Sequence, residues 1–186
     1  MGASNDSTGF LRNQVELSNI LRRYWSDLVH WTWTVFVSRL FDLEHLPVLQ
    51  RRMLKNASDI ASVFGSLYGN AVATRLERVL SEHYNTLFAM SEALATGDME
   101  TANVLNQRLY QQLDDVVEIL GNANSNIDKA ELQVLLYNFL SLTEEEAMLI
   151  FSRQYDESTA QYDRIYDQAM RIADYLGYAI IRQLRA

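Results

Sequence analysis

The sequence predicts an all-α protein, an antiparallel six-helix bundle built from three repeated helix hairpins. Its 186 residues include one proline and seven glycines, which is few for a β-rich chain that needs many turns. Apolar residues recur at steps of three and four along six segments, the spacing of one helix face. Residues 13–186 are predicted to form a single domain around one core, and residues 1–12, which begin with small and polar side chains, a disordered lead-in.

Local signals place the ends of the predicted helices. The helices are expected at residues 13–42, from 47 to between 65 and 69, 70–95, 99–120, 128–142 and 158–184, with a short extra helix after residue 143. Pro47 suits a first helical turn, where its missing N–H costs nothing. Gly97 is predicted to stop the third helix and Asp98 to cap the fourth. Thr143 with Glu146 three residues later matches a capping box, which predicts a break in the fifth helix.

The sequence also resembles itself at an offset of 56 residues. Gly65, Gly121 and Gly177 fall in register, and each is predicted to end the second helix of its hairpin. Asp59 aligns with Asp115 in the same way. Apolar positions follow the offset, including the sets Ile20, Leu76, Leu132 and Tyr24, Leu80, Leu136. A helix hairpin cannot bury its apolar stripe alone, so the three copies are predicted to pack on one another.

Composition excludes several classes of function. The formal net charge of −8 would repel phosphate backbones, so nucleic acid is an unexpected partner. The absence of cysteine removes disulfides, thiolate nucleophiles and cysteine-ligated metals. The most apolar stretch, residues 28–40, is short of the ~20 residues of a membrane span and contains His30 and Arg39. With no secretory signal recognised at the N-terminus, the protein is expected to be cytoplasmic and to have no membrane partner.

His83 is the polar residue that most suggests a site, because it falls on the inward stripe of the third helix. A buried imidazole needs hydrogen-bond partners, or its desolvation destabilises the fold. Asp59, Asp115 and Asp163 are possible partners by pattern. One interpretation is a divalent metal site inside the bundle. The favoured one is a hydrogen-bonded core histidine, because metal sites in bundles need several convergent ligands.

The other histidines are weaker candidates. Di-iron bundles require Glu-x-x-His on two helices, and that motif does not occur here. The pairs Asp27 with His30 and Asp42 with His45 have a one-turn spacing that can hold a cation. A solvated face or a helix end is the expected position of both pairs.

The first helix carries a second apolar face in addition to its inward stripe. Its members are Trp25, Val29, Trp33, Phe36 and Leu40. Such a helix is expected either to be buried on two sides or to meet another subunit. A homodimer through Trp33 and Phe36 is therefore one predicted partner arrangement.

Short motifs along the chain carry a resemblance. They are the run from Leu21 to Ser38, Asn56-x-x-Asp59-Ile60, Tyr68-Gly69, His83, Ala95-Thr96-Gly97-Asp98, Asp115, Leu140-Ser141-Leu142-Thr143 and Tyr162-Asp163. Together they resemble a bacterial all-helical family of unknown function, over nearly the whole chain from residue 20 onward. Some of its members carry kinase-like names, but this chain has no nucleotide-binding glycine loop.

The resemblance has an implication for metal binding. Members of that family often place a histidine in the middle of helices one, three and five. In this chain only His83 is present, and Leu28 and Phe139 occupy the other two places. If the three histidines bind metal in relatives, the resemblance implies that this site is lost or remodelled here.

No sequence motif indicates catalysis. The chain lacks the Gly-x-Ser-x-Gly elbow, a phosphate-binding glycine loop and a dinucleotide fingerprint. We therefore expect a non-enzymatic helical binding or interaction module without a cofactor. The alternative is a bundle that binds a metal or a small ligand around His83.

Overall fold

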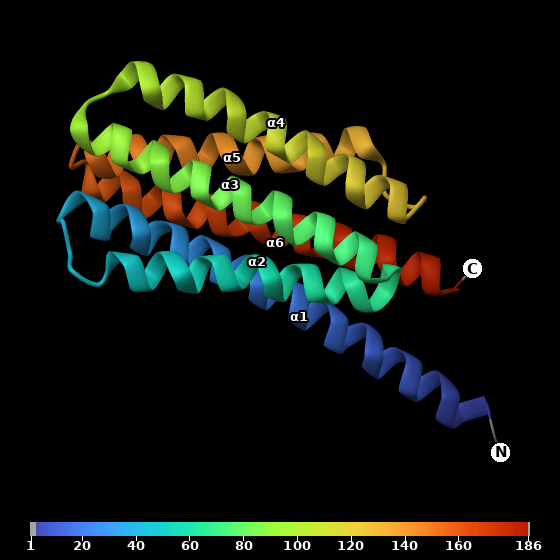
Figure 1. Cartoon of the computed structure of the whole chain (residues 1–186). Helices are drawn as coiled ribbons and strands as arrows, with labels where there is room; N and C mark the ends of the chain where they lie inside the picture. Colours follow the sequence, from blue (N-terminus) through green and yellow to red (C-terminus); the bar gives the residue numbers. More distant parts are fainter. Residues whose placement is uncertain (1–2, 186) are drawn as a thin grey trace.

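The computed structural model describes residues 3–185, with side chains from residue 13 onward, and in this range the chain forms six α-helices and no strand (Figure 1). The helices are α1 (Ala3–Leu40), α2 (Leu46–Tyr68), α3 (Asn70–Thr96), α4 (Met99–Ala123), α5 (Lys129–Phe151) and α6 (Tyr155–Arg185). The predicted all-α class is confirmed.

The helices form a closed antiparallel arrangement. Each helix packs on the next, and α6 also packs along α1. The parallel helices α1, α3 and α5 contact one another in the middle, and each of α2, α4 and α6 packs mainly on two of these three. Across the α1–α6 seam, Arg22 donates two hydrogen bonds of 2.7 Å to the carboxylate of Asp174.

Equivalent core positions recur in the three hairpins, with one correction to the predicted alignment. Leu76 of α3 and Leu132 of α5 are 1% and 0% exposed, as the offset of 56 predicts. Their counterpart in α1 is Leu21, which is 2% exposed, and not Ile20, which is 38% exposed. The offset from α1 to α3 is therefore 55 residues in this part of the core, because a one-residue shift rotates a helix face by about 100°.

The three aligned glycines lie inside helices, so the prediction that they end them is wrong. A Cβ on Gly65 would lie 2.6 Å from Cβ of Ala73 in α3, and one on Gly121 would lie 2.5 Å from Cγ of Lys129 in α5. In both pairs the glycine lets the following helix approach closely. Gly177 faces Leu21 of α1 at an ordinary contact distance of 3.6 Å.

Other helix ends follow the local signals. Gly97 ends α3 in the left-handed conformation, at φ 75°, and the carboxylate of Asp98 accepts a hydrogen bond of 3.0 Å from the N–H of Thr101 in the first turn of α4. Gly69 separates α2 from α3 with a φ of 91°, which favours glycine. Asp128 caps α5 by accepting from the N–H groups of residues 130 and 131.

Two predicted boundaries are corrected. Helix α1 begins at Ala3 and not at Asn13, so the predicted disordered lead-in is helical from residue 3. Figure 1 shows this part of α1 projecting beyond the other helices. Helix α5 continues through Thr143 without a break. The Thr143 hydroxyl donates a 2.8 Å hydrogen bond back to the carbonyl of Phe139, so no capping box forms.

Within the part of the chain that the structure describes, no helix combines the length and the apolar character needed to cross a bilayer.

Candidate functional site

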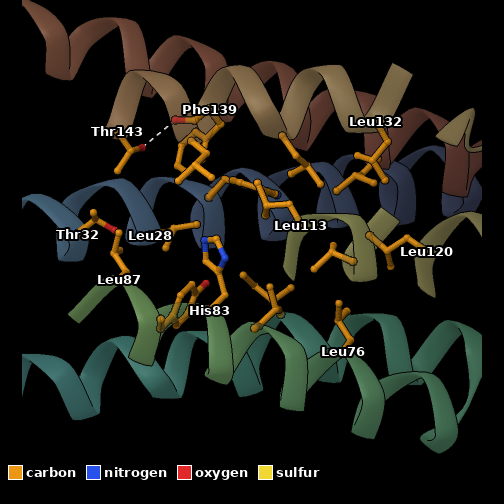
Figure 2. A pocket seen from close by; sticks show the side chains of 18 of the residues that line it. Leu28, Thr32, Leu76, His83, Leu87, Leu113, Leu120, Leu132, Phe139 and Thr143 are labelled. Atoms are coloured by element: carbon orange, nitrogen blue, oxygen red, sulfur yellow. Dashed lines mark hydrogen bonds between the residues drawn. The ribbon is translucent and has the colours of Figure 1, made fainter. Parts of the chain in front are cut away.

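The central feature of the bundle is a cavity of about 60 Å³ that is lined by residues of all six helices, mostly those of α1, α3 and α5. Figure 2 shows its side chains converging from several helices, with His83 pointing between Leu28 and Leu113. From the three central helices, it is lined by Trp25, Leu28, Thr32, Leu76, Leu80, His83, Tyr84, Leu87, Leu132, Leu136, Phe139, Leu140 and Thr143. The lining is almost entirely apolar, and His83 is its one imidazole.

The three hairpins contribute equivalent positions to this lining. Leu28 of α1, His83 of α3 and Phe139 of α5 fall at the same level of the bundle, 55 and 56 residues apart. Thr32, Leu87 and Thr143 form the next level, one helical turn away. The agreement supports the predicted repeat, and it makes His83 a polar substitution at a position that is apolar in the other two copies.

His83 is neutral at physiological pH and lacks a full set of partners. Burial lowers the pKa of His83 to about 4, and a hydrogen bond to the backbone of Leu109 in α4 acts in the opposite direction. Its Nδ1 atom is buried without a hydrogen-bond partner. The side chain as a whole is half-buried, and it lines the cavity. The prediction that His83 lies in the interior is therefore confirmed.

Other polar side chains at the cavity form hydrogen bonds with groups of the protein. The hydroxyl of Tyr84 donates to Oδ1 of Asn56 at 3.1 Å, and Nδ2 of Asn56 donates to the carbonyl of Tyr24 at 3.1 Å. Thr143 donates to Phe139. Among the described residues that line the cavity, Nδ1 of His83 is thus the buried side-chain atom left with hydrogen-bonding capacity.

The carboxylates predicted to join His83 do not do so. Asp59 lies on α2 and pairs with Lys55, with Oδ1 2.5 Å from Nζ. Asp115 and Asp163 are exposed, and none of the three lines the cavity. Residues 3–185 contain no group of three or more His, Cys, Asp or Glu side chains able to hold a metal ion. The predicted four-residue metal site is therefore not assembled.

The two one-turn histidine pairs are also separated by other contacts. Asp27 pairs with Arg52 of α2 at 3.2 Å, and the exposed His30 packs edge-on against Trp31 with ring centroids 4.8 Å apart. Nε2 of His45 lies 3.4 Å from the Ser38 hydroxyl. In each pair, one of the two groups that a cation would need, Asp27 or Nε2 of His45, is therefore next to another partner.

The second face of α1 is buried within the chain. Trp25 packs edge-on against Phe139 of α5 and Trp33 against Tyr162 of α6, at centroid distances of 5.5 and 6.3 Å. Phe36 is 0% exposed. Phe36 is therefore unavailable to a second subunit, which corrects its predicted place in a homodimer interface. Trp33 is half-buried, and a dimer through this residue stays a prediction.

The burial of one acidic residue, Glu146, was not predicted from the sequence. Glu146 of α5 is 1% exposed, and its Oε1 has no hydrogen-bond partner. Burial raises the pKa of Glu146 to about 8, so its carboxyl is mainly protonated at neutral pH. The available signal was its position, seven residues after Phe139 on the same face of α5 and 56 residues after the buried Met90.

Comparison with known proteins does not assign a family or a function to this site. Searches of protein families, curated proteins and solved structures found no match for this chain.

Proposed function

We propose that this protein is a non-enzymatic helical binding module that takes a small, mostly apolar ligand with one hydrogen-bond donor in the cavity at His83. The observation that carries the proposal is the unpartnered Nδ1 of His83 beside an apolar space. Ligand pockets in proteins are commonly apolar, with a few polar groups that fix orientation.

The chemistry of His83 sets the kind of ligand. A neutral imidazole has one donor and one acceptor nitrogen. If the ring donates to the Leu109 backbone through Nε2, Nδ1 is the acceptor, and a ligand O–H or N–H satisfies it. A cavity of about 60 Å³ corresponds to about four to six water-sized spheres, so the ligand has about that number of non-hydrogen atoms.

The proposal is tested with two probes of equal size, cyclopentanol and methylcyclopentane. Their dissociation constants are measured by NMR titration with the native protein and with His83→Leu, which installs the residue type found at position 28. We expect the preference for the alcohol over the hydrocarbon to fall at least tenfold in the variant. His30→Leu is the matched control, because His30 is exposed and is not among the residues that line the cavity. An unchanged preference in His83→Leu refutes the role of His83.

The alternative of a divalent metal at His83 has its own measurement. Elemental analysis of the purified native protein and of His83→Ala decides between a bound metal and a small-molecule ligand at His83. Stoichiometric metal that disappears in the variant would replace the small-molecule proposal. Metal at the same level in both proteins would place the metal elsewhere.

A further inference from the structure

A second pocket, of about 350 Å³, lies near the α3–α4 connection, between the end of α3, the start of α4 and the second half of α5. It shares no lining residue with the cavity at His83. Its lining includes three methionines, Met90, Met99 and Met148, which we call the methionine wall. Its polar lining residues, which we call the polar wall, are Asn103, Asn106, Ser141, Glu144 and Glu145. A lining with both kinds of side chain suits a ligand that has an apolar body and a polar end.

The polar wall has more hydrogen-bond acceptors than the protein satisfies. Oε2 of Glu144 accepts from the hydroxyl of Tyr110 at 3.2 Å, while Oε1 of Glu144 is buried without a partner. Oδ1 of Asn106 is also buried and unpartnered. The two side chains are neighbours, because Asn106 is among the groups that act to lower the pKa of the Glu144 carboxyl. Adjacent unpaired acceptors call for a ligand that donates several hydrogen bonds.

The charged residues of the pocket indicate that the ligand's donor group is positively charged. No lysine or arginine lines it, and both Glu144 and Glu145 do. Burial raises the pKa of Glu144, as expected for a carboxyl with no cation beside it. A cationic group would favour the ionised carboxylate, and its hydrogen bonds would be charge-assisted.

The methionine wall fits a flexible apolar body. Met90 is 3% exposed and forms the inner part of the wall, while Met99 and Met148 are 45% and 44% exposed at its outer part. Methionine side chains are unbranched and polarisable, so they adapt to chains of different shape. An aliphatic chain can therefore lie along them while its charged end reaches Glu144.

We propose that this pocket binds an aliphatic primary ammonium ion, with the ammonium group on Glu144 and Asn106 and the alkyl chain along the three methionines. The ammonium group supplies three donors, which match the unpartnered oxygens and leave one for solvent or for Ser141.

The test uses three probes that share a six-carbon chain: hexylamine, 1-hexanol and hexanoate. Each is titrated into the intact protein at pH 7 while backbone amide resonances are followed by NMR. We expect saturable shifts for hexylamine around residues 99–106 and 141–148, with binding at least tenfold tighter than for 1-hexanol and none for hexanoate. Equal affinity for hexylamine and 1-hexanol, or no saturable shift with hexylamine, would overturn the proposal.

Two variants locate the binding. Glu144→Gln keeps the shape of the side chain and removes its charge, and it should weaken hexylamine binding at least tenfold. Asn103→Trp fills the pocket from an exposed position, leaves the charge of Glu144 in place and should also prevent binding. Val104→Trp is the matched control, since Val104 is 62% exposed and does not line the pocket, and it should bind hexylamine like the native protein.

The tryptophan pair decides the question if Glu144→Gln does not fold. Native-like binding by Asn103→Trp, or by a folded Glu144→Gln, would show that the ammonium ion does not bind in this pocket. The result is independent of the cavity at His83, because hexylamine binding in His83→Leu should be unchanged.

Discussion

Replacing Glu146 with glutamine should stabilise the protein by an amount that depends on pH. Glu146 is 1% exposed in α5, and burial raises its pKa from the ordinary 4.5 to about 8. Tyr162 of α6 is close enough for the ionised carboxylate to raise the tyrosine pKa. Glutamine has nearly the same shape and cannot ionise, so the variant isolates the effect of the proton.

The sign and size of the effect follow from proton binding. Below pH 4.5 the carboxyl is protonated in both states and contributes no pH dependence. Between pH 4.5 and 8 the unfolded chain loses the proton while the folded chain keeps it, so native stability falls by about 1.4 kcal/mol per pH unit. Over the two and a half units from pH 4.5 to 7 the loss is about 3 kcal/mol. Above pH 8 both states are ionised and the loss is constant.

The assay is urea unfolding followed by tryptophan fluorescence at pH values from 4.5 to 8.5. The difference in unfolding free energy between Glu146→Gln and the native protein should grow by about 3 kcal/mol from pH 4.5 to 7. Glu77→Gln, at an exposed position in α3, is the control and should show no such growth. A difference for Glu146→Gln that is constant within about 0.5 kcal/mol across this range would refute the assigned burial of an unpaired carboxyl.

Three further predictions concern the core. Burial lowers the pKa of His83 to about 4, so between pH 6.5 and 4 only the unfolded chain binds the imidazole proton. The contribution of His83 to native stability should therefore fall by about 1.4 kcal/mol per unit as pH falls through that range. Urea unfolding should show this as a growing stability difference between His83→Leu and the native protein, a difference in which the opposite contribution of Glu146 cancels. Gly65→Ala should destabilise the folded protein by about 1–3 kcal/mol, because the new methyl group clashes with α3. Gly177→Ala has room for a methyl group and should stabilise the folded protein by about 0.5–1 kcal/mol. Equal effects of the two substitutions in chemical unfolding would contradict the packing described. Phe36→Ala should lower the free energy of unfolding by about 3–5 kcal/mol, with an unfolding midpoint that does not depend on protein concentration. Light scattering of the native protein and of Trp33→Ala tests the predicted homodimer. A native protein that is monomeric at every concentration would exclude it.

The fold was predictable where local chemistry determines it. Gly97 and Asp98 act at a helix end through their own backbone and side-chain preferences, and both positions were predicted correctly. Gly65 was misplaced because its role depends on Ala73 of another helix, which a local signal does not contain. Thr143 and Glu146 match a capping motif, but tertiary packing continues the helix and buries the glutamate.

The candidate site was predictable to the level of a helix face. The apolar stripe correctly places His83 inside the bundle. The same pattern could not choose its partners, because a residue next to a buried position is rotated by about 100° and can point to solvent. Asp115 illustrates this, since it is exposed directly before the buried Val116. The pocket at Glu144 depends on three helices meeting at one end of the bundle, and no single segment encodes it.

The seam between α1 and α6 bears on the order of folding. Each hairpin joins helices that are adjacent in the chain, and such local contacts form early because little loop entropy opposes them. Arg22 and Asp174 are separated by 152 positions, so their contact is among the most distant that the chain must make. Until the last helix docks, the apolar faces of α1 and α5 that it covers are open to water and to other chains. A state in which α6 has not docked would therefore expose apolar surface, and aggregation would compete with the docking of this helix.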